Sequence, residues 1–588
     1  MANTLTSSVA VFEDPGHVGS YWQLAHRREN SSVDITTTGT TIAAEETSTL
    51  RIIGDWDLYT YGIWTTTLYL EKKDAAGAWE VVRSWKSNDD RNVIANGTES
   101  EETEFRLRII AGSADLASGG YYPRFILEAA DSKIFGLVKI NSVTSSTVAD
   151  VTIVNPVQST DATTLWTEGA FSAAKGFPRT VTGYGGRAWY AGTSAVGNGL
   201  WGSVSNDYNN FRRSTLDDSS LAFAPSAQER NEANWLASQG ETLIMGTSGE
   251  EWTIHGDGKP ITPTNFQIER QSKFGSAYLP AQLVDESIVF TQRGNRKMRR
   301  IAARSDADSW SAPDLTVLAE HVTVSGIIQT AFASNPHSIL WCVTADGRLL
   351  GMTYETEQNV FGWHVHNTDG LIESVAVIYG GEVDEVWLTV LRSGRRTVER
   401  LDSAAFGRVF DAPEALIYVD GAKTYDSGSP VTSVTGLDHF DGKSVSILAD
   451  GADYGLQTVV SGTVTISPAA TKIIVGLPFT SELQPMPIDV PLEDGSSQHR
   501  RWRISRVGLY LHDSLGGEIA DAPDHDFEPL VFRDGVDNIE DAPPLFTGHK
   551  DVSIQSSTRD EVEVIVRTAG PYPLNIGALT VKGDIYGE

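Results

Sequence analysis

The sequence predicts an all-β protein, with a central β-propeller of about five or six blades flanked by β-sandwich-like modules. One pattern (a turn, an apolar strand, a polar or Gly-containing turn and a second strand) recurs at intervals of 45 to 54 residues. A strand-built repeat of about 40 to 50 residues is typical of propeller blades. Alternation of apolar and polar residues recurs elsewhere, whereas helical periodicity is scarce. The five copies begin at Gly186, Gly240, Asp285, Asn335 and Glu382.

The part of the chain before the repeats reads as two β modules. Residues 65–85, TTTLYLEKKDAAGAWEVVRSW, alternate apolar and polar residues around a Gly-containing turn, which predicts a hairpin. We predict an N-terminal β-rich domain over 1–135 and a small β module over 136–172. Further strands of the N-terminal domain are expected in RIIGDW (51–56), EFRLRII (104–110) and YPRFILEAA (122–130).

The repeats define the propeller, which we predict over residues 173–411, with a sixth copy hidden in the less regular stretch 255–280. After Leu401 the pattern gives way to other strands, such as SVSILADG and RWRISRVGLYL. We predict a small β domain over 412–483 and a C-terminal β domain over 484–588. A chain of 588 residues is too long for one core, so several domains are expected.

Charge and cysteine content restrict the function. The net charge is −31, from 46 basic and 77 acidic residues, so the chain lacks the overall basic footprint of a DNA reader. Cys342 is the only cysteine, which excludes an internal disulfide, and its strand context predicts a buried structural thiol. The N-terminus lacks the features of a signal peptide and no apolar run could span a membrane, so we expect synthesis in the host cytoplasm and no membrane span.

Motifs that carry catalysis are missing from the sequence. There is no P-loop, GxSxG or HExxH motif, and the paired acids Asp217/Asp218 and Glu250/Glu251 are adjacent, so a strand would point them to opposite faces. His364 and His366 would share one face of a strand, but no third metal ligand lies nearby, which favours two ordinary strand residues. We predict that the chain is not an enzyme and needs no cofactor or metal.

Several segments resemble the tail nozzle proteins of short-tailed bacteriophages, also called tail tubular protein B or stabilisation proteins. The resemblance covers residues 140–511 and carries structural signatures without a catalytic motif. The segments with the clearest likeness are GFPRTVTGYGGRAWYAGT (176–193), LWGSVSNDYNNF (200–211), TSGEEWTI (247–254), PITPTNFQIERQSKFGS (260–276), APDLTVLAEHV (312–322) and ILWCVTADGRLLGMTYETEQNVFGWHVHNTDG (339–370), with weaker ones in TGLDHFDGKSV (435–445) and RRWRISRVGLYL (500–511).

This resemblance implies a virion protein of the phage tail. It implies a homo-hexamer beneath an adaptor ring protein, with tail fibres or spikes attached and double-stranded DNA passing non-specifically through the lumen during ejection. An acidic chain agrees with a conduit that forms no stable nucleic-acid complex, because each basic phosphate contact adds affinity. The alternative is a carbohydrate-binding or glycan-degrading propeller, a tail spike or lectin, which the many Trp and Tyr residues of the repeats would suit.

The densest charge run, residues 513–541, holds ten acids and one base, Arg533. Three interpretations stay open: a lumen or tip loop that repels DNA, a solvated loop on the outer surface, or a calcium loop, although EF-hand spacing is absent. The acids are Asp513, Glu518, Asp521, Asp524, Asp526, Glu528, Asp534, Asp537, Glu540 and Asp541.

Two basic clusters stand out in this acidic chain. Arginine pairs bidentately with carboxylates, so each cluster is a candidate interface with a neighbouring subunit, with a solvated face or a DNA contact as the alternatives. Arg501 and Arg503 would share one face of a strand. The first cluster is Arg293, Arg296, Lys297, Arg299, Arg300 and Arg304, and the second is Arg500, Arg501, Arg503 and Arg506.

Overall fold

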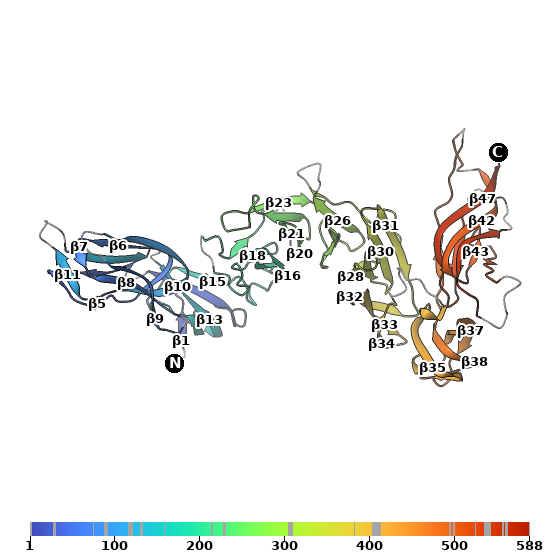
Figure 1. The fold of residues 1–588 in the computed structure, drawn as a ribbon, viewed down its shortest axis with the longest axis horizontal. Helices are drawn as coiled ribbons and strands as arrows, with labels where there is room; N and C mark the ends of the chain where they lie inside the picture. Colours follow the sequence, from blue (N-terminus) through green and yellow to red (C-terminus); the bar gives the residue numbers. More distant parts are fainter. Residues whose placement is uncertain are drawn as a thin grey trace. The chain divides into compact units, whose positions relative to one another are not determined.

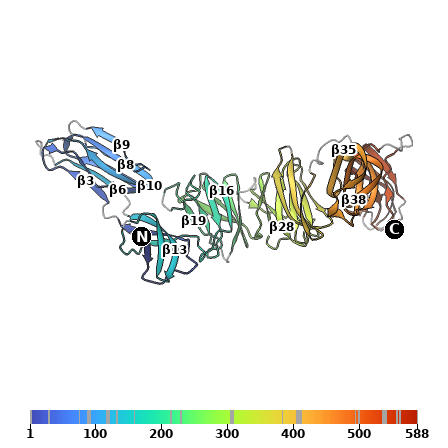
Figure 2. The same ribbon diagram turned by 90° about the horizontal axis from the view of Figure 1, so that it is seen from below.

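The computed structural model of the chain is built from β-strands joined by turns and loops, so the all-β prediction is confirmed (Figures 1 and 2). Its described helices are two short 3₁₀ helices, η2 (Pro413–Ala415) and η3 (Asp438–Phe440). The chain divides into two compact units, Met1–Lys273 and Phe274–Glu588. The structure describes residues 3–586 apart from 28–30, 75, 87–91, 116–121, 130–132, 158, 213–215, 227–230, 304–309, 382, 403–412, 493–494, 498–499, 524, 534–541, 555–557 and 559–562.

The chain's first strands join a five-stranded sheet with residues that follow the N-terminal domain. Its order is β1-β14-β13-β2-β15, so residues 3–27 pair with residues 133–168 across the boundary that the sequence places at 135/136. Trp22 and Ile140 lie in its small core. The strands are β1 (Asn3–Thr6), β2 (Tyr21–Arg27), β13 (Lys133–Ser145), β14 (Val148–Asn155) and β15 (Trp166–Glu168).

Between these strands lies an antiparallel β domain with one larger and one smaller sheet. The larger sheet has the order β3-β12-β6-β10-β8-β9, with β5 paired to β10, and the smaller sheet has the order β4-β11-β7. Both contribute to one core around Trp64, Phe105 and Phe125. The hairpin predicted over 65–85 is confirmed, since β8 pairs with β9. The strands are β3 (Ser32–Thr36), β4 (Thr41–Ile42), β5 (Glu45–Glu46), β6 (Leu50–Tyr61), β7 (Ile63–Thr65), β8 (Thr67–Lys73), β9 (Trp79–Lys86), β10 (Ile94–Ile109), β11 (Gly112–Asp115) and β12 (Arg124–Ala129).

The five sequence repeats form five consecutive antiparallel meanders, called the repeat sheets below. Each is built from neighbouring strands in chain order, as in a propeller blade. The first two belong to the first unit and the other three to the second, and the number of blades stays a prediction. In the first unit the strands are β16 (Thr180–Tyr184), β17 (Arg187–Ala191), β18 (Leu200–Gly202), β19 (Leu221–Phe223), β20 (Ala233–Gln239), β21 (Thr242–Thr247), β22 (Glu251–His255) and β23 (Gln267–Ser272).

In the second unit the repeat sheets pack through apolar faces. The third and fourth share a core around Met298 and Leu340, and the fourth and fifth share one around Trp341 and Val386. The strands are β24 (Gln282–Val284), β25 (Ser287–Thr291), β26 (Met298–Ala303), β27 (Trp310–Ser311), β28 (Ile327–Ala333), β29 (Ile339–Thr344), β30 (Leu349–Glu355), β31 (Val360–His366), β32 (Leu371–Tyr379), β33 (Asp384–Arg392) and β34 (Arg395–Arg400).

Tryptophan–glycine pairs recur across neighbouring strands of the repeat sheets. Trp189 lies opposite Gly202, Trp235 opposite Gly246 and Trp341 opposite Gly351. A Cβ on Gly246 would lie 2.1 Å from the Trp235 ring, so only glycine leaves room for the indole there. The three rings are buried, and Trp189 and Trp341 belong to cores that neighbouring repeat sheets share, which gives these residues a packing role.

Two further β domains follow the repeats. One sheet, of order β35-β38-β36-β37, surrounds a core that includes Phe440 and Val475. The C-terminal domain packs the sheet β45-β42-β47 against the sheet β39-β46-β43-β44 around Trp502, Leu509 and Val566, and a short ladder joins β40 and β41. The strands are β35 (Asp420–Thr435), β36 (Ser444–Ala449), β37 (Ala452–Thr458), β38 (Thr463–Leu477), β39 (Ser481–Leu483), β40 (Pro491–Leu492), β41 (Gly495–Ser496), β42 (Arg501–Ser514), β43 (Glu518–Ala520), β44 (Glu528–Pro529), β45 (Phe546–Ser553), β46 (Ile565–Thr568) and β47 (Asn575–Tyr586).

Candidate functional site

The acids of the 513–541 run have different environments in the structure. Asp513 accepts a hydrogen bond from Thr547 Oγ1 at 2.9 Å. Glu518 on β43 pairs with Arg567 at 2.5 Å. Asp521 is buried, with Oδ1 2.5 Å from Nδ1 of His525. Asp526 and Glu528 are exposed, whereas Asp524, Asp534, Asp537, Glu540 and Asp541 lie outside the described residues.

Part of this acidic run therefore has a structural role within the C-terminal domain. The buried Asp521 and the paired Glu518 stabilise local contacts, and a charge held in this way contributes little to the field outside the protein. The exposed members Asp526 and Glu528 can interact with a partner. Placement of this run along a DNA channel stays a prediction.

The first basic cluster is divided between internal contacts and solvent. Lys297 lies between Asp314 and Glu320, at 2.9 and 2.7 Å, and its hydrogen bonds to Glu320 and Asp314 raise its pKa. Arg299 donates to the Ala312 carbonyl at 2.7 Å and lies over the Phe274 ring. Arg300 is half-buried on β26, Arg293 and Arg296 are exposed, and Arg304 lies outside the described residues.

The second basic cluster lies on β42 and is largely exposed. Arg501 and Arg503 alternate with the buried Trp502 and Ile504, so the prediction that they share a face is confirmed. Register shifts between Ile504 and Arg506 in the pairing with β47, and this bulge returns Arg506 to the exposed side. Arg500 is half-buried before the strand begins.

His364 and His366 form a pair on β31. Nδ1 of His364 lies 2.7 Å from Nε2 of His366, and both rings contact Trp341. Burial lowers the pKa of both histidines, that of His366 to about 4, where His364 adds to the effect of burial. No group of three or more His, Cys, Asp or Glu residues that could hold a metal occurs among the described residues. Core packing accounts for this pair.

The adjacent acids Glu250 and Glu251 contact different residues, as expected for neighbours on a strand. Glu250 accepts hydrogen bonds from Asn231 and Arg270, whereas Glu251 accepts one from Ser272. Arg187, which the sequence analysis did not single out, is buried and donates to the backbone carbonyls of Asp217, Asp218, Ser203 and Ser219. The alternation that buries Arg187, Trp189 and Ala191 on one face of β17 was the available signal.

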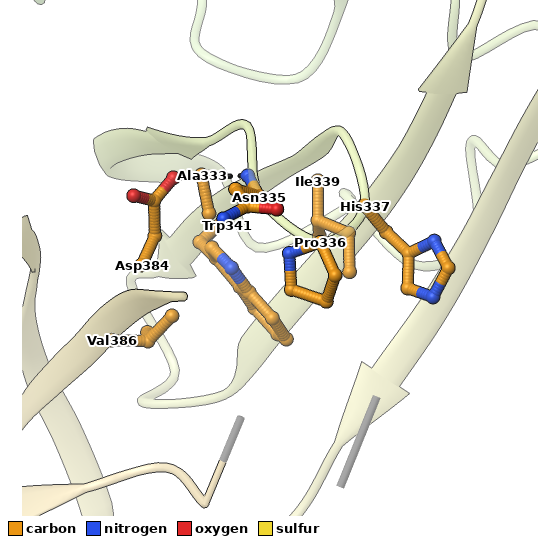
Figure 3. Close-up of a pocket in the computed structure, with 8 residues that line it drawn as sticks. All are labelled: Ala333, Asn335, Pro336, His337, Ile339, Trp341, Asp384 and Val386. Atoms are coloured by element: carbon orange, nitrogen blue, oxygen red, sulfur yellow. Dashed lines mark hydrogen bonds between the residues drawn. The ribbon is translucent and has the colours of Figure 1, made fainter. Parts of the chain in front are cut away.

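A small pocket lies between the fourth and fifth repeat sheets (Figure 3). Asp384 Oδ2 accepts hydrogen bonds from the backbone N–H groups of Ser334 at 2.7 Å and Asn335 at 3.1 Å. The ring of Trp341 and Pro336 supply its apolar wall. Asp384 is the sole carboxylate among the lining residues, whereas glycoside hydrolysis ordinarily needs two facing carboxyl groups. Asp384 therefore links the fifth repeat sheet to residues 334 and 335 at the end of a strand of the fourth.

The aromatic residues of the repeats are divided between buried and exposed positions, with Tyr278 and Tyr379 exposed. Trp189, Trp252 and Trp341 are buried. Tyr190 and Trp201 are half-buried and lie with Phe171 and Phe211 on the first repeat sheet. Buried rings cannot present a platform to a sugar, so the buried members of this set have a packing role. Cys342 is buried, as predicted, and burial raises the pKa of its thiol.

Solved structures resemble the chain only weakly. A protein from Lactobacillus plantarum is 10% identical, covering 58% of this chain and 94% of its own, with a TM-score of 0.26. A glycoside hydrolase is 9% identical, covering 68% and 96%, with a TM-score of 0.21. A family 32 glycoside hydrolase from Bifidobacterium adolescentis is 10% identical, covering 95% and 100%, with a TM-score of 0.17. Scores of this size carry no argument about activity.

No protein-family model and no curated protein matches the chain. Among the described residues, no helix is long and apolar enough to cross a membrane. The case for function therefore rests on the chain's own residues and on the surfaces that its β domains expose.

Proposed function

We propose that this chain is a structural subunit of the tail nozzle of a short-tailed phage. In this role it forms the distal part of the DNA-ejection channel and offers attachment surfaces to an adaptor ring and to fibres or spikes. The observation that carries the proposal is that the segments that resemble tail nozzle proteins also form the repeat sheets. Strands of these sheets lie in segments 176–193, 247–254 and 339–370.

The use of polar groups in the repeat sheets supports a scaffold. Arg187, Glu250 and Glu251 are buried and engaged in hydrogen bonds within the protein. Such contacts fix loops and join strands, and a catalytic carboxylate or base would instead face a cleft. The proposal therefore assigns the repeat sheets a mechanical role and no chemical step.

Location within the particle tests this proposal. We expect an antibody against the chain, visualised with gold on negatively stained particles from the source, to label the tail stub below one capsid vertex. A validated antibody that labels the capsid shell alone, or no particle at all, would overturn the proposal. Free fibres or spikes carrying the label would favour the glycan-binding alternative.

A further inference from the structure

The antiparallel β domain that contains β3 to β12 is inserted into the five-stranded sheet. The chain leaves this sheet after β2 and returns to it at β13, and Arg27 and Lys133 at these two points are direct cross-strand partners. The strands between them have a core of their own around Trp64 and Phe125. The resemblance to tail nozzle proteins begins at residue 140, so it does not include this inserted domain. A domain joined to the rest of the chain at one point can carry a separate function.

Two tyrosines lie on the outer face of the larger sheet of the inserted domain. Residues of β6 alternate, so that Leu58 is in the core whereas Tyr59 and Tyr61 face outward. The centres of the two tyrosine rings are 5.4 Å apart and their planes are at 75°. A hydrogen bond from the Tyr59 hydroxyl to Glu128 raises the pKa of Tyr59 to about 12 and fixes its ring. Tyr61 packs edge-on against this fixed ring and is 51% exposed.

Polar side chains of the neighbouring strands surround the two rings. Arg124 on β12 is the direct cross-strand partner of Tyr61, and Asn96 on β10 is that of Asp57. Asp57 and Asn96 are exposed, and neither side chain forms a hydrogen bond with another residue that the structure describes. Their donors and acceptors are therefore available to a ligand beside the Tyr61 ring. We call the following residues the tyrosine face: Asp57, Tyr59, Tyr61, Asn96, Arg124 and Glu128.

The chemistry of the tyrosine face fits an uncharged sugar. An exposed aromatic ring can stack on the C–H groups of a sugar ring, while carboxylate and amide groups beside it bind the hydroxyl groups. Acids predominate on this part of the sheet, so an anionic sugar would be repelled. No group of three or more His, Cys, Asp or Glu that could hold a metal occurs in the described part of the chain. The acids are Asp34, Asp55, Asp57 and Glu128, and the base is Arg124.

We propose that the tyrosine face of the inserted domain binds an uncharged saccharide. The ring of Tyr61 stacks on a sugar ring, and Asp57 and Asn96 form hydrogen bonds with its hydroxyl groups. Glu128 acts as a positioning residue, because it holds Tyr59 against Tyr61. This inference goes beyond the proposed function and does not depend on it, because a DNA conduit needs no sugar site and the inserted domain lies outside the segments that resemble nozzle proteins.

Binding of full-length protein to a printed array of bacterial surface glycans, both uncharged and acidic, tests the site. The oligosaccharide with the strongest signal is then titrated calorimetrically with wild type and variants. We expect the wild type to bind uncharged glycans, and Y61A and D57A/N96A each to bind about tenfold more weakly, because they remove the stacking ring or the hydrogen-bonding groups. Y61F keeps the ring and should bind like the wild type.

The matched control is Y379A, which removes a tyrosine that is 80% exposed in the fifth repeat sheet and should leave binding unchanged. A further variant replaces residues 28–132 by an Asn-Gly turn between Arg27 and Lys133, and should lose binding. The proposal would be overturned by an array without an uncharged hit, by binding confined to acidic glycans, by wild-type affinity of Y61A, or by binding that survives the deletion. Urea titration of Y61A and D57A/N96A checks that both variants are folded.

Discussion

Charged residues inside the repeat sheets and on the outer face of β42 and β47 are used in opposite ways. In the repeat sheets, Arg187 is buried against backbone carbonyls and Arg392 pairs with Glu399 at 2.7 Å. In the C-terminal domain, Arg503, Lys582 and Glu528 remain exposed. A charge engaged inside the fold supports the fold, whereas an exposed charge on a flat sheet is available to a partner. Arg187 and Arg392 thus support the fold of the repeat sheets, whereas the exposed charges of the C-terminal domain are available for contacts with a partner.

The substitution Trp235→Ala should have the largest effect, because it tests whether buried packing stabilises the repeat sheets. The indole is buried and packs over Gly246, so its removal leaves a cavity beside the second repeat sheet. We expect a loss of about 3 to 5 kcal/mol in the free energy of unfolding, measured by urea titration. Tyr379→Ala, at a site 80% exposed, is the control and should change stability by less than about 0.5 kcal/mol. Equal effects of the two substitutions would contradict the packing role.

Arg187→Met tests whether a buried charge supports a loop. The variant keeps an unbranched side chain but leaves the carbonyls of Asp217, Asp218, Ser203 and Ser219 without their donor. We expect a loss of about 3 kcal/mol, with faster amide exchange in residues 216–221, measured by hydrogen exchange. Arg395→Met removes an exposed arginine and should leave both quantities unchanged. Unaltered exchange in R187M would show that the loop does not depend on this side chain.

Acid should weaken the fourth repeat sheet through His366. Burial, with a contribution from His364, lowers the folded-state pKa from the ordinary 6.5 to about 4. The unfolded chain therefore binds more protons between these values, so stability is present above pH 6.5 and falls as the pH decreases towards 4. The expected loss between pH 7 and pH 5 is about 2 kcal/mol. His366→Leu should have a shallower pH dependence of unfolding than the wild type, and identical slopes would contradict the assignment.

The smallest effect on stability is expected at the contact surface. Arg503, Arg506 and Lys582 are exposed, so R503E/R506E/K582E should change the free energy of unfolding by less than about 1 kcal/mol. Urea titration of monomer at about 1 M salt measures this change without contribution from assembly. A large destabilisation would mean that these three side chains support the C-terminal domain itself, and the contrast with the repeat sheets would be lost.

Local patterns in the sequence predicted much of the architecture. The five repeats correspond to the five repeat sheets, the 65–85 hairpin is present, and Cys342 is buried. Alternation also placed Arg501 and Arg503 together on one face of β42. These features depend on residues close in sequence, where the two-residue period of a strand determines which side chains share a face.

Long-range pairing could not be predicted in the same way. Residues 3–27 join the sheet of residues 133–168 across more than a hundred intervening residues, and no local pattern specifies that partner. Asp521 looked like one more solvated acid of a charge run, but the fold buries it beside His525. Lys582 lies opposite Arg506 because β47 pairs with the distant strand β42. The pairing of strands that are distant in sequence determines which residues lie together, and local sequence patterns do not specify this pairing.

The central claim, a nozzle scaffold with an exposed contact surface, is tested most directly by counting the chain in purified particles. Quantitative mass spectrometry against isotope-labelled peptides of this chain would give its copy number relative to the portal and the major capsid protein. The account predicts one hexamer of the chain for each particle. Absence of the chain from infectious particles, or a copy number comparable with that of the capsid protein, would contradict it.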